Sequence, residues 1–402
     1  MDNRIIWIWL SLHFGAGNKI YQKLYNHFGS IEAIYDSDDA DVDTIKWLSN
    51  SYKRSLLDKN LDHAHEVVEW CEDNNVQIVT PSDAEYPFPL RQLDDYPPVL
   101  YYRGKLPHFE RELCISVVGT RKMTVYGQKN AYELGFGLAK GGAIVVSGMA
   151  LGIDCTAQKG ALYAGGSAIA VLGSGIDVVY PLKNAALMEK IARVGAVITE
   201  YPPHTPPNGY NFPIRNRIIS ALSTATVVVE ADLNSGAMIT ANLALKQGKD
   251  LFAFPGPVKY FSTTGTNKLI SEGALMATAA IDVLEHYLDR FSDKIDLQAS
   301  KERPVFEKAL KVASNFDSES FYATSNSKEN SQTEEKATQK FDTSALSEKE
   351  KLVYDKMEFD KPVSLDFFAS LELDTSDLAM CITMLEINGA IESLPGGFYK
   401  KK

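Results

Sequence analysis

The sequence predicts an α/β fold built on a doubly wound, mostly parallel β-sheet. Six short apolar runs between residues 114 and 256 predict its strands: CISVVG, AIVVSG, AIAVLG, AVITEY, TVVVEA and LFAFPG. Continuous runs of Val, Ile, Ala and Leu are typical of parallel strands that are buried on both faces. Amphipathic stretches between the runs, such as YGQKNAYELGFGLAKGG, predict helices that end at glycine. This alternation indicates an extended Rossmann-like domain over residues 80–295.

A small helical domain is expected before the sheet, over residues 1–75. Two helices joined through Gly15 and Gly17 are typical of a helix-hairpin-helix or SAM-like domain. The amides of such a turn can hold a phosphate. A plain helical bundle with a tight turn is the alternative, and the acidic stretch DSDDADVD favours it.

Two further segments are expected after the sheet. Residues 312–344 are rich in Ser, Thr, Asn, Glu and Lys and poor in aliphatic side chains, which predicts a disordered linker. Order is expected to resume at Ser347, which forms a capping-box pattern with Glu350. Three short helices and a Gly-Gly hairpin then predict a winged helix over residues 345–402.

The composition indicates a cytoplasmic protein with a full hydrophobic core. Of its 402 residues, 45% are hydrophobic and 23% are charged, and no run approaches the length of a membrane helix. The four cysteines are scattered, which favours neither a disulfide framework nor a zinc site. The net charge is −11, but residues 111–290 carry 16 Lys and Arg against 13 Asp and Glu. An anionic ligand is therefore expected to meet the middle of the chain.

Motifs of catalysis are missing from the sequence. It contains no GxxxxGK[ST] phosphate loop, no HExxH and no GxSxG. The Gly-x-Gly of VLGSGIDV lacks the third glycine of a dinucleotide fingerprint, because Val178 takes that position. His204 is the only histidine between residues 111 and 285, which leaves little scope for a catalytic triad. We therefore expect no enzyme, no catalytic residue, no cofactor and no metal.

Small residues and isolated cations follow the predicted strands instead. Parallel α/β sheets bind ligands in the crevice at the carboxyl ends of their strands. Asp154 is expected to be the N-cap of a helix there, in a structural role. The candidate ligand-binding residues at these strand ends and helix starts are Gly119, Thr120, Arg121, Lys122, Ser147, Gly148 and Lys268.

The stretch FPIRNRIISALS adds four candidates: Phe212, Arg215, Asn216 and Arg217. Pro213 is expected to be the first residue of a helix, which would place both arginines in the first turn, at the positive end of the helix dipole. Cations are unfavourable there, so an anion should offset them. An anionic ligand and a structural ion pair, for example with Glu230, are both open. Phe212 is expected either to stack on a base or to lie buried at the helix start.

Several ordered motifs resemble the DprA/Smf family, DNA-processing protein A of bacteria. They are GTRKMTVYG, SGMALGID, AVLGSGIDVVYP, FPIRNRIISALS, EADLNSGAMITANLALKQGKDLFAFPG and GTNKLISEGA, within residues 80–290. The resemblance implies a non-catalytic homodimer that binds single-stranded DNA and loads RecA during natural transformation. It also implies that six residues belong to the DNA pocket: Gly119, Thr120, Arg121, Arg215, Asn216 and Arg217.

Two observations limit what the resemblance implies. Some family members carry a basic residue where this chain has Ser167, so one phosphate contact is expected to be absent or supplied by Lys159 or Lys183. The predicted winged helix has six acidic residues and no Lys or Arg between Pro362 and Tyr399, so it is expected to contact protein rather than duplex DNA. The alternative function is a nucleotide-binding enzyme or sensor related to the phosphoribohydrolase (lysine decarboxylase-like) family.

Overall fold

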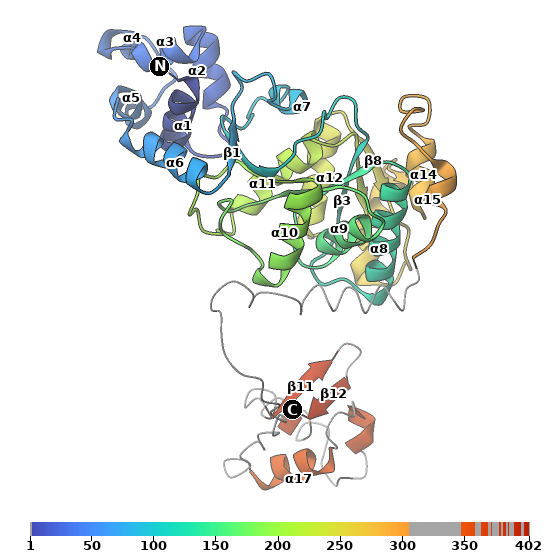
Figure 1. Cartoon of the computed structure of the whole chain (residues 1–402). Coiled ribbons are helices and arrows are strands. Elements are labelled where there is room, and N and C mark those ends of the chain that lie inside the picture. The colour runs from blue at the N-terminus through green and yellow to red at the C-terminus, as the bar shows by residue number, and fades with distance from the viewer. Residues whose placement is uncertain are drawn as a thin grey trace, which may run out of the picture. The chain divides into compact units, whose positions relative to one another are not determined.

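The computed structural model describes residues 2–304, 347–357, 363–368, 371, 378, 381–382, 385, 390–394 and 398–401. The chain divides into two compact units (Figure 1). The first contains the elements from α1 to α15, and the second contains those from α17 to β12. The predicted linker over residues 312–344 lies outside the described residues.

Six short helices precede the sheet in the first unit. The first turns of α1, α3, α4 and α5 are stabilised by side-chain caps: Asp2, Ser30, Asp38 and Ser49 each accept a backbone N–H. Trp7, Trp9 and Leu24 are fully buried among them. The helices are α1 (Asn3–Phe14), α2 (Ile20–Phe28), α3 (Ile31–Asp36), α4 (Asp39–Asp43), α5 (Asn50–Leu57) and α6 (Asp62–Asp73).

A nine-stranded sheet forms the centre of this unit, in the order β1-β2-β6-β5-β4-β3-β7-β8-β9. All neighbours from β6 to β9 are parallel, whereas β1 and β2 add an antiparallel edge. The prediction of a doubly wound, mostly parallel sheet is confirmed. The strands are β1 (Gln77–Val79), β2 (Leu100–Gly104), β3 (Cys114–Val118), β4 (Ile144–Ser147), β5 (Ala168–Val171), β6 (Ala196–Thr199), β7 (Ala225–Val228), β8 (Asp250–Ala253) and β9 (Leu275–Met276).

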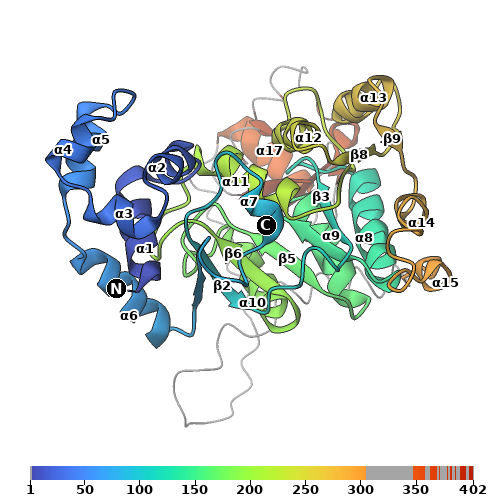
Figure 2. The ribbon, with the colours of Figure 1, turned by 90° about the horizontal axis from the view of Figure 1, so that it is seen from above.

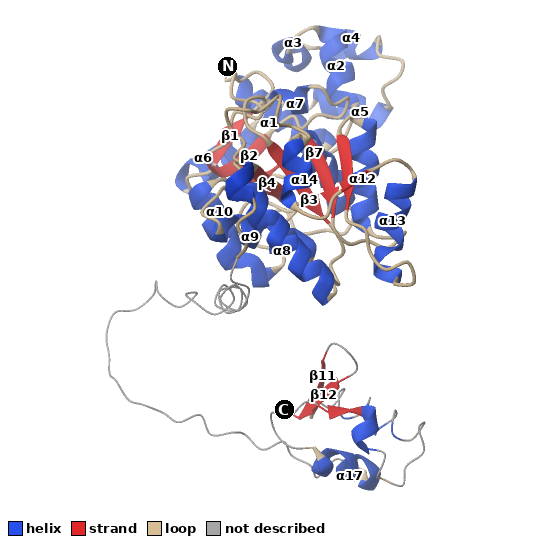
Figure 3. Cartoon of the chain, turned by 90° about the vertical axis from the view of Figure 1, so that its right-hand side faces the viewer, coloured by secondary structure: helices blue, strands red, loops and turns tan. Residues whose placement is uncertain are grey.

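Helices cover both faces of the sheet (Figure 3). Ile115 and Val117 face one layer, which includes α8 (Val125–Lys140) and α9 (Ile153–Tyr163). Cys114 and Val118 face the other, which includes α11 (Asn211–Ala221) and α12 (Gly236–Lys246). Because alternate side chains of β3 point to opposite layers, both faces of the strand are apolar. The remaining helices are α7 (Phe88–Arg91), η1 (Leu182–Asn184), α10 (Ala185–Val194), η2 (Phe261–Thr263), α13 (Thr264–Ser271), α14 (Ala280–Glu285) and α15 (Leu297–Ser300).

The N-terminal helices pack against the sheet at its β2 and β6 side (Figure 2). At the turn between α1 and α2, the N–H of Gly17 donates to Glu200 Oε2 over 3.4 Å. Gly17 has φ of +67°, and a Cβ there would lie 2.5 Å from Ile214 Cγ2. Only glycine fits this close, left-handed position. This amide therefore bonds to the protein itself and is not available for the phosphate that a helix-hairpin-helix would bind.

The described residues of the second unit include the α-helix α17, a 3-10 helix, four helical residues between 378 and 385, and a three-stranded antiparallel sheet of order β10-β12-β11. Ser347 caps α17 and forms the predicted capping box with Glu350. The residues between η4 and β11 that were expected to be helical lie mostly outside the described residues. The elements are α17 (Glu348–Lys356), β10 (Val363–Ser364), η4 (Leu365–Phe368), β11 (Ile391–Leu394) and β12 (Phe398–Lys401).

Candidate functional site

A cavity of about 640 Å³ opens at the carboxyl ends of the central strands, and we call it the carboxyl-end cavity. Six of the eleven predicted site residues line it: Gly119, Thr120, Arg121, Phe212, Arg215 and Asn216. They come from the loop after β3 and from α11, which are about ninety residues apart in the sequence.

The strand order explains why a cavity forms at this place. The connection from β3 leads to β4 on one side, whereas β7 pairs with β3 on the other side. Loops that leave neighbouring strands in opposite directions create a crevice between them. The first turns of α9, α11 and α12 line this crevice, through Asp154, Phe212 and Ala237 respectively. The positive ends of three helix dipoles therefore point to one cavity, which favours an anion.

Arg121 is the cation of this cavity that is free to bind a ligand. Its side chain is exposed, and it has no ion-pair partner among the described residues. Its guanidinium carbon lies 5.2 Å from the ring centroid of Phe212, within the range of a cation–π contact. The ring of Tyr180 lies 5.4 Å from that of Phe212, tilted by 37°. The cavity thus combines an exposed guanidinium with two aromatic rings.

Arg215 also lines the cavity, but its guanidinium is buried under the strand ends. It is 3% exposed, and it donates to the carbonyls of Gly148, over 2.9 Å, and Val171. Burial lowers the pKa of Arg215 to about 10, although the nearby charge of Asp154 acts in the opposite direction. Arg215 therefore donates to the last carbonyl of β5 and to the first carbonyl after β4. Its charge adds positive potential at the floor of the cavity.

Arg217 does not face this cavity, and its partner is not Glu230. It forms a bidentate ion pair with Glu200, with nitrogen–oxygen distances of 2.6 and 2.7 Å, and also donates to the carbonyl of Asp95. The side chains of Arg217 and Glu200 are 4% and 0% exposed. Burial by itself lowers the pKa of Arg217, but the charge of Glu200, the hydrogen bonds to Glu200 and the charge of Asp95 together outweigh burial and raise that pKa. Of the two alternatives for this arginine, the structure contains the internal ion pair.

The position of the helix start differs from the prediction, and this explains in part why the two arginines do not lie in the first turn. The helix α11 begins at Asn211, so Pro213 is its third residue rather than its first. Both arginines then lie in the second turn, where the unpaired N–H groups of the helix start have ended. The first turn carries no cation, and its positive end is left to face the cavity.

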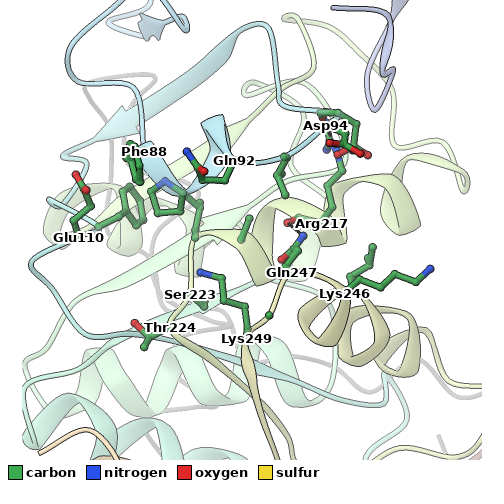
Figure 4. A pocket seen from close by; sticks show the side chains of 18 of the residues that line it. Phe88, Gln92, Asp94, Glu110, Arg217, Ser223, Thr224, Lys246, Gln247 and Lys249 are labelled. Carbon is green, nitrogen blue, oxygen red and sulfur yellow. Dashed lines mark hydrogen bonds and ion pairs between the residues drawn. The ribbon is translucent and has the colours of Figure 1, made fainter. Parts of the chain in front are cut away.

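Arg217 lines a second cavity, of about 760 Å³, at the amino ends of β7 and β8 (Figure 4). We call it the amino-end cavity. In Figure 4, Arg217 and Asp94 lie on one side of it, and Phe88 and Glu110 lie on the other. Here α11 and α12 end, so the helix dipoles present their negative ends. Burial and the charge of Arg290 lower the pKa of Lys249 in this cavity.

Four other predicted site residues lie outside the carboxyl-end cavity. Ser147 is buried, and its hydroxyl donates to the carbonyl of Val117. Gly148 is buried against the guanidinium of Arg215. Lys122 is exposed beside the cavity without lining it. The stretch GTNKLISEGA does lie at the start of a helix, α13, but Lys268 is its fifth residue and lies 3.7 Å from Glu272.

Asp154 is not the N-cap of α9, because Gly152 holds that position and Asp154 is the second residue of the helix. Its Oδ2 accepts the N–H of Gly148 over 3.1 Å. Burial raises the pKa of this carboxyl. Asp154 therefore fixes the backbone after β4, which agrees with the expected structural role.

Sequence reasoning missed several residues that line the cavity. Nothing local marks Tyr180, which meets Phe212 only because the loop after β5 folds back over α11. The stretch NSGAMITA could have been found from the sequence, because its small polar residues lie at the start of α12. Its members in the cavity lining are Ser235, Gly236, Ala237, Ile239 and Thr240.

Within the described part of the chain, no group of His, Cys, Asp and Glu side chains is arranged to hold a metal ion. His204 pairs with Asp177 over 2.6 Å, but neither residue lines the cavity. The cavity is therefore suited to a ligand that carries both an anionic group and aromatic rings.

No helix in this part of the chain is both long and apolar enough to span a bilayer.

Comparison with known proteins identifies the family. The family model described as DNA recombination-mediator protein A matches residues 77–288. Protein Smf of Synechocystis is 35% identical over 272 residues, which are 67% of this chain and 68% of that protein. Protein Smf of Escherichia coli is 41% identical over 219 residues, which cover 54% of this chain and 58% of that protein.

Among solved structures, that of DNA processing protein A from Streptococcus pneumoniae matches with a TM-score of 0.61 and 30% identity. The match covers 71% of this chain and 98% of that one. The region matched by the family model includes the whole nine-stranded sheet and thus the residues of the carboxyl-end cavity. The chain therefore belongs to the DNA recombination-mediator protein A family.

Proposed function

We propose that this protein binds single-stranded DNA in the carboxyl-end cavity and mediates recombination by loading RecA onto the bound strand. The observation that carries the proposal is the exposed Arg121 beside the ring of Phe212, at a point where three helices begin. Phosphates suit the guanidinium and the helix starts, and unpaired bases suit the aromatic rings. Duplex DNA hides its base faces, so single strands are favoured.

The family supports the recombination role, and the cavity supports the ligand. We further propose that the protein acts in the cytoplasm as a homodimer and that the C-terminal unit contacts protein rather than duplex DNA. The acidic sequence between Pro362 and Tyr399 supports the last point, since non-specific duplex binding needs cations on phosphates.

The direct test is fluorescence anisotropy of a labelled oligothymidine over a salt series. The logarithm of the affinity should fall linearly with the logarithm of the salt concentration, by about 0.7 per phosphate contact. The Arg121→Ala variant should bind more weakly at low salt and show a slope that is smaller by about 0.7. Equal affinities and slopes for the two proteins would exclude this cavity as the DNA site.

A second assay addresses the recombinase. RecA assembly on single strands coated with single-strand-binding protein should be faster when this protein is added, and Arg121→Ala should reduce that gain.

Hydrolysis of nucleoside monophosphates, followed by chromatography, serves as the test of the alternative enzyme function. A truncated protein that ends near residue 300 should keep any duplex affinity that the full chain has. A large loss would refute the role proposed for the C-terminal unit.

A further inference from the structure

Glu230 is a buried carboxylate without a cationic partner. It follows β7, is 0% exposed, and forms no ion pair with any residue that the structure describes. Its Oε2 accepts the N–H of Thr124 over 2.9 Å, and its Oε1 accepts no hydrogen bond from the described residues. A buried, uncompensated charge is costly, so its retention requires a specific source of positive potential.

The N-terminus of α8 is that source. Thr124 is the N-cap of this 16-residue helix, and the carboxylate lies against its first amide. A helix start of this length presents a positive partial charge and free N–H donors. In dinucleotide-binding sheets, the equivalent helix after the first strand receives a phosphate of the ligand. Here the carboxylate of Glu230 occupies that position.

The backbone of Glu230 holds the other end of the same loop. Its carbonyl accepts the N–H of Thr120 over 2.7 Å. The two hydrogen bonds from Thr120 and Thr124 therefore enclose the segment that carries Arg121. One buried residue thus fixes both ends of loop 119–124, whose tip is exposed.

Gly127 keeps the space that this arrangement needs. A Cβ at Gly127 would lie 1.9 Å from Glu230 Oε2, which is far inside contact distance. Any larger residue would push the carboxylate away from the helix start. Because glycine inside a helix normally costs about 1 kcal/mol relative to alanine, its presence here needs a packing reason, and the carboxylate supplies one.

We propose that Glu230 is a positioning residue for single-strand binding: it fixes loop 119–124 so that Arg121 faces Phe212 across the carboxyl-end cavity. This inference rests on the proposed function. It also implies that the Glu230 carboxylate, and not a phosphate of the ligand, occupies the start of α8. A bound strand then meets the starts of α9, α11 and α12 instead.

The test is a double-mutant cycle on oligothymidine binding with Glu230→Ala and Arg121→Ala. Alone, Glu230→Ala should weaken binding about tenfold, the effect of losing one hydrogen bond to a charged group. In the Arg121→Ala background, it should weaken binding by less than about twofold, since the residue it positions is gone. Glu230→Gln keeps an acceptor for the Thr124 amide and should restore affinity to within about threefold of the wild type.

The outcomes separate the inference from the function on which it rests. An equal loss in both backgrounds would show that Glu230 acts on the fold as a whole, and the inference would be wrong. It would also be wrong if Arg121→Ala weakened binding and Glu230→Ala did not. If Arg121→Ala itself had no effect, the DNA site would be wrong, and the inference would fail with it.

A second variant serves if Glu230→Ala does not fold. Gly127→Ala keeps the Glu230 side chain, but the added Cβ should push its carboxylate away from the Thr124 amide. It should reproduce the loss of affinity in the wild-type background and not in the Arg121→Ala background. Retained full affinity in a folded Gly127→Ala protein would overturn the inference.

Discussion

The two cavities at opposite ends of the sheet are similar in size, but they differ in helix direction and in their cations. Among the described residues, two cations line the carboxyl-end cavity and five line the amino-end cavity. The carboxyl-end cavity receives the first turns of α9, α11 and α12, whereas the amino-end cavity receives the last turns of α11 and α12. Helix starts attract anions, and helix ends attract cations. The same arginine-rich helix, α11, thus has one arginine under the first cavity and another in the wall of the second.

The comparison teaches that the number of cations does not identify an anion site. At the carboxyl ends, Arg121 is exposed and has no ion-pair partner in the part of the chain that the structure describes. At the amino ends, Arg217 is already neutralised by Glu200, and Lys19 is paired with Asp94 over 3.1 Å. Four predictions test this difference, in order of decreasing expected effect.

The largest effect is expected on stability, from Arg217→Met. The change leaves the buried carboxylate of Glu200 without its partner and should lower the free energy of unfolding by about 3–5 kcal/mol. Urea denaturation followed by circular dichroism measures it. The double variant Arg217→Met with Glu200→Gln removes both charges and should be more stable than the single variant. If Arg217→Met lowered DNA affinity without lowering stability, Arg217 would belong to the DNA site after all.

The second effect is expected from Phe212→Leu, which keeps an apolar side chain and removes the ring. Affinity for single strands should fall by about 1–3 kcal/mol, the contribution of one base stacked on an aromatic side chain. Quenching of 2-aminopurine in the bound strand should fall as well. Unchanged quenching would mean that no base contacts this ring. Leucine also preserves most of the contact with Gly173, so a large loss of stability is not expected.

A third, intermediate effect is expected from Arg215→Lys. Lysine keeps the positive charge but cannot donate to the carbonyls of Gly148 and Val171 in the same planar geometry. The melting temperature should fall, and the salt slope of DNA binding should stay within error of the wild type. A smaller slope would show that this guanidinium itself contacts a phosphate.

The smallest effect is expected at the amino-end cavity. Lys249→Ala removes a cation that faces the ends of two helices, and affinity for oligothymidine should change by less than about twofold. Arg121→Ala, measured in parallel, is the matched comparison at the other cavity. A tenfold loss from Lys249→Ala would mean that both ends of the sheet bind the strand.

The strands could be predicted from the sequence because a strand buried on both faces needs a continuous apolar run. The run TVVVEA is an example, and its first three residues lie in β7 (Ala225–Val228). The antiparallel strands β1 and β2 were not predicted. They are short, and the pairing of β2 with β6 joins residues about one hundred positions apart.

The surroundings of individual side chains were harder to predict. The partners of Arg217 are 17 and 122 positions away in the sequence, so no local pattern distinguishes it from Arg215 or Arg121. The loop after β3 was found because glycine and cations follow a strand directly. Tyr180 was missed because its ring meets Phe212 through tertiary folding alone.

The contact of Gly17 with Glu200 and Ile214 has a practical consequence for protein engineering. A shortened protein that starts at the sheet would expose the apolar side of Ile214 to water and remove one donor from the Glu200 carboxylate. Expression trials of such a fragment should therefore yield aggregates more readily than trials of the whole first unit. The N-terminal helices look like a separate domain in the sequence, but the turn between α1 and α2 packs against α11.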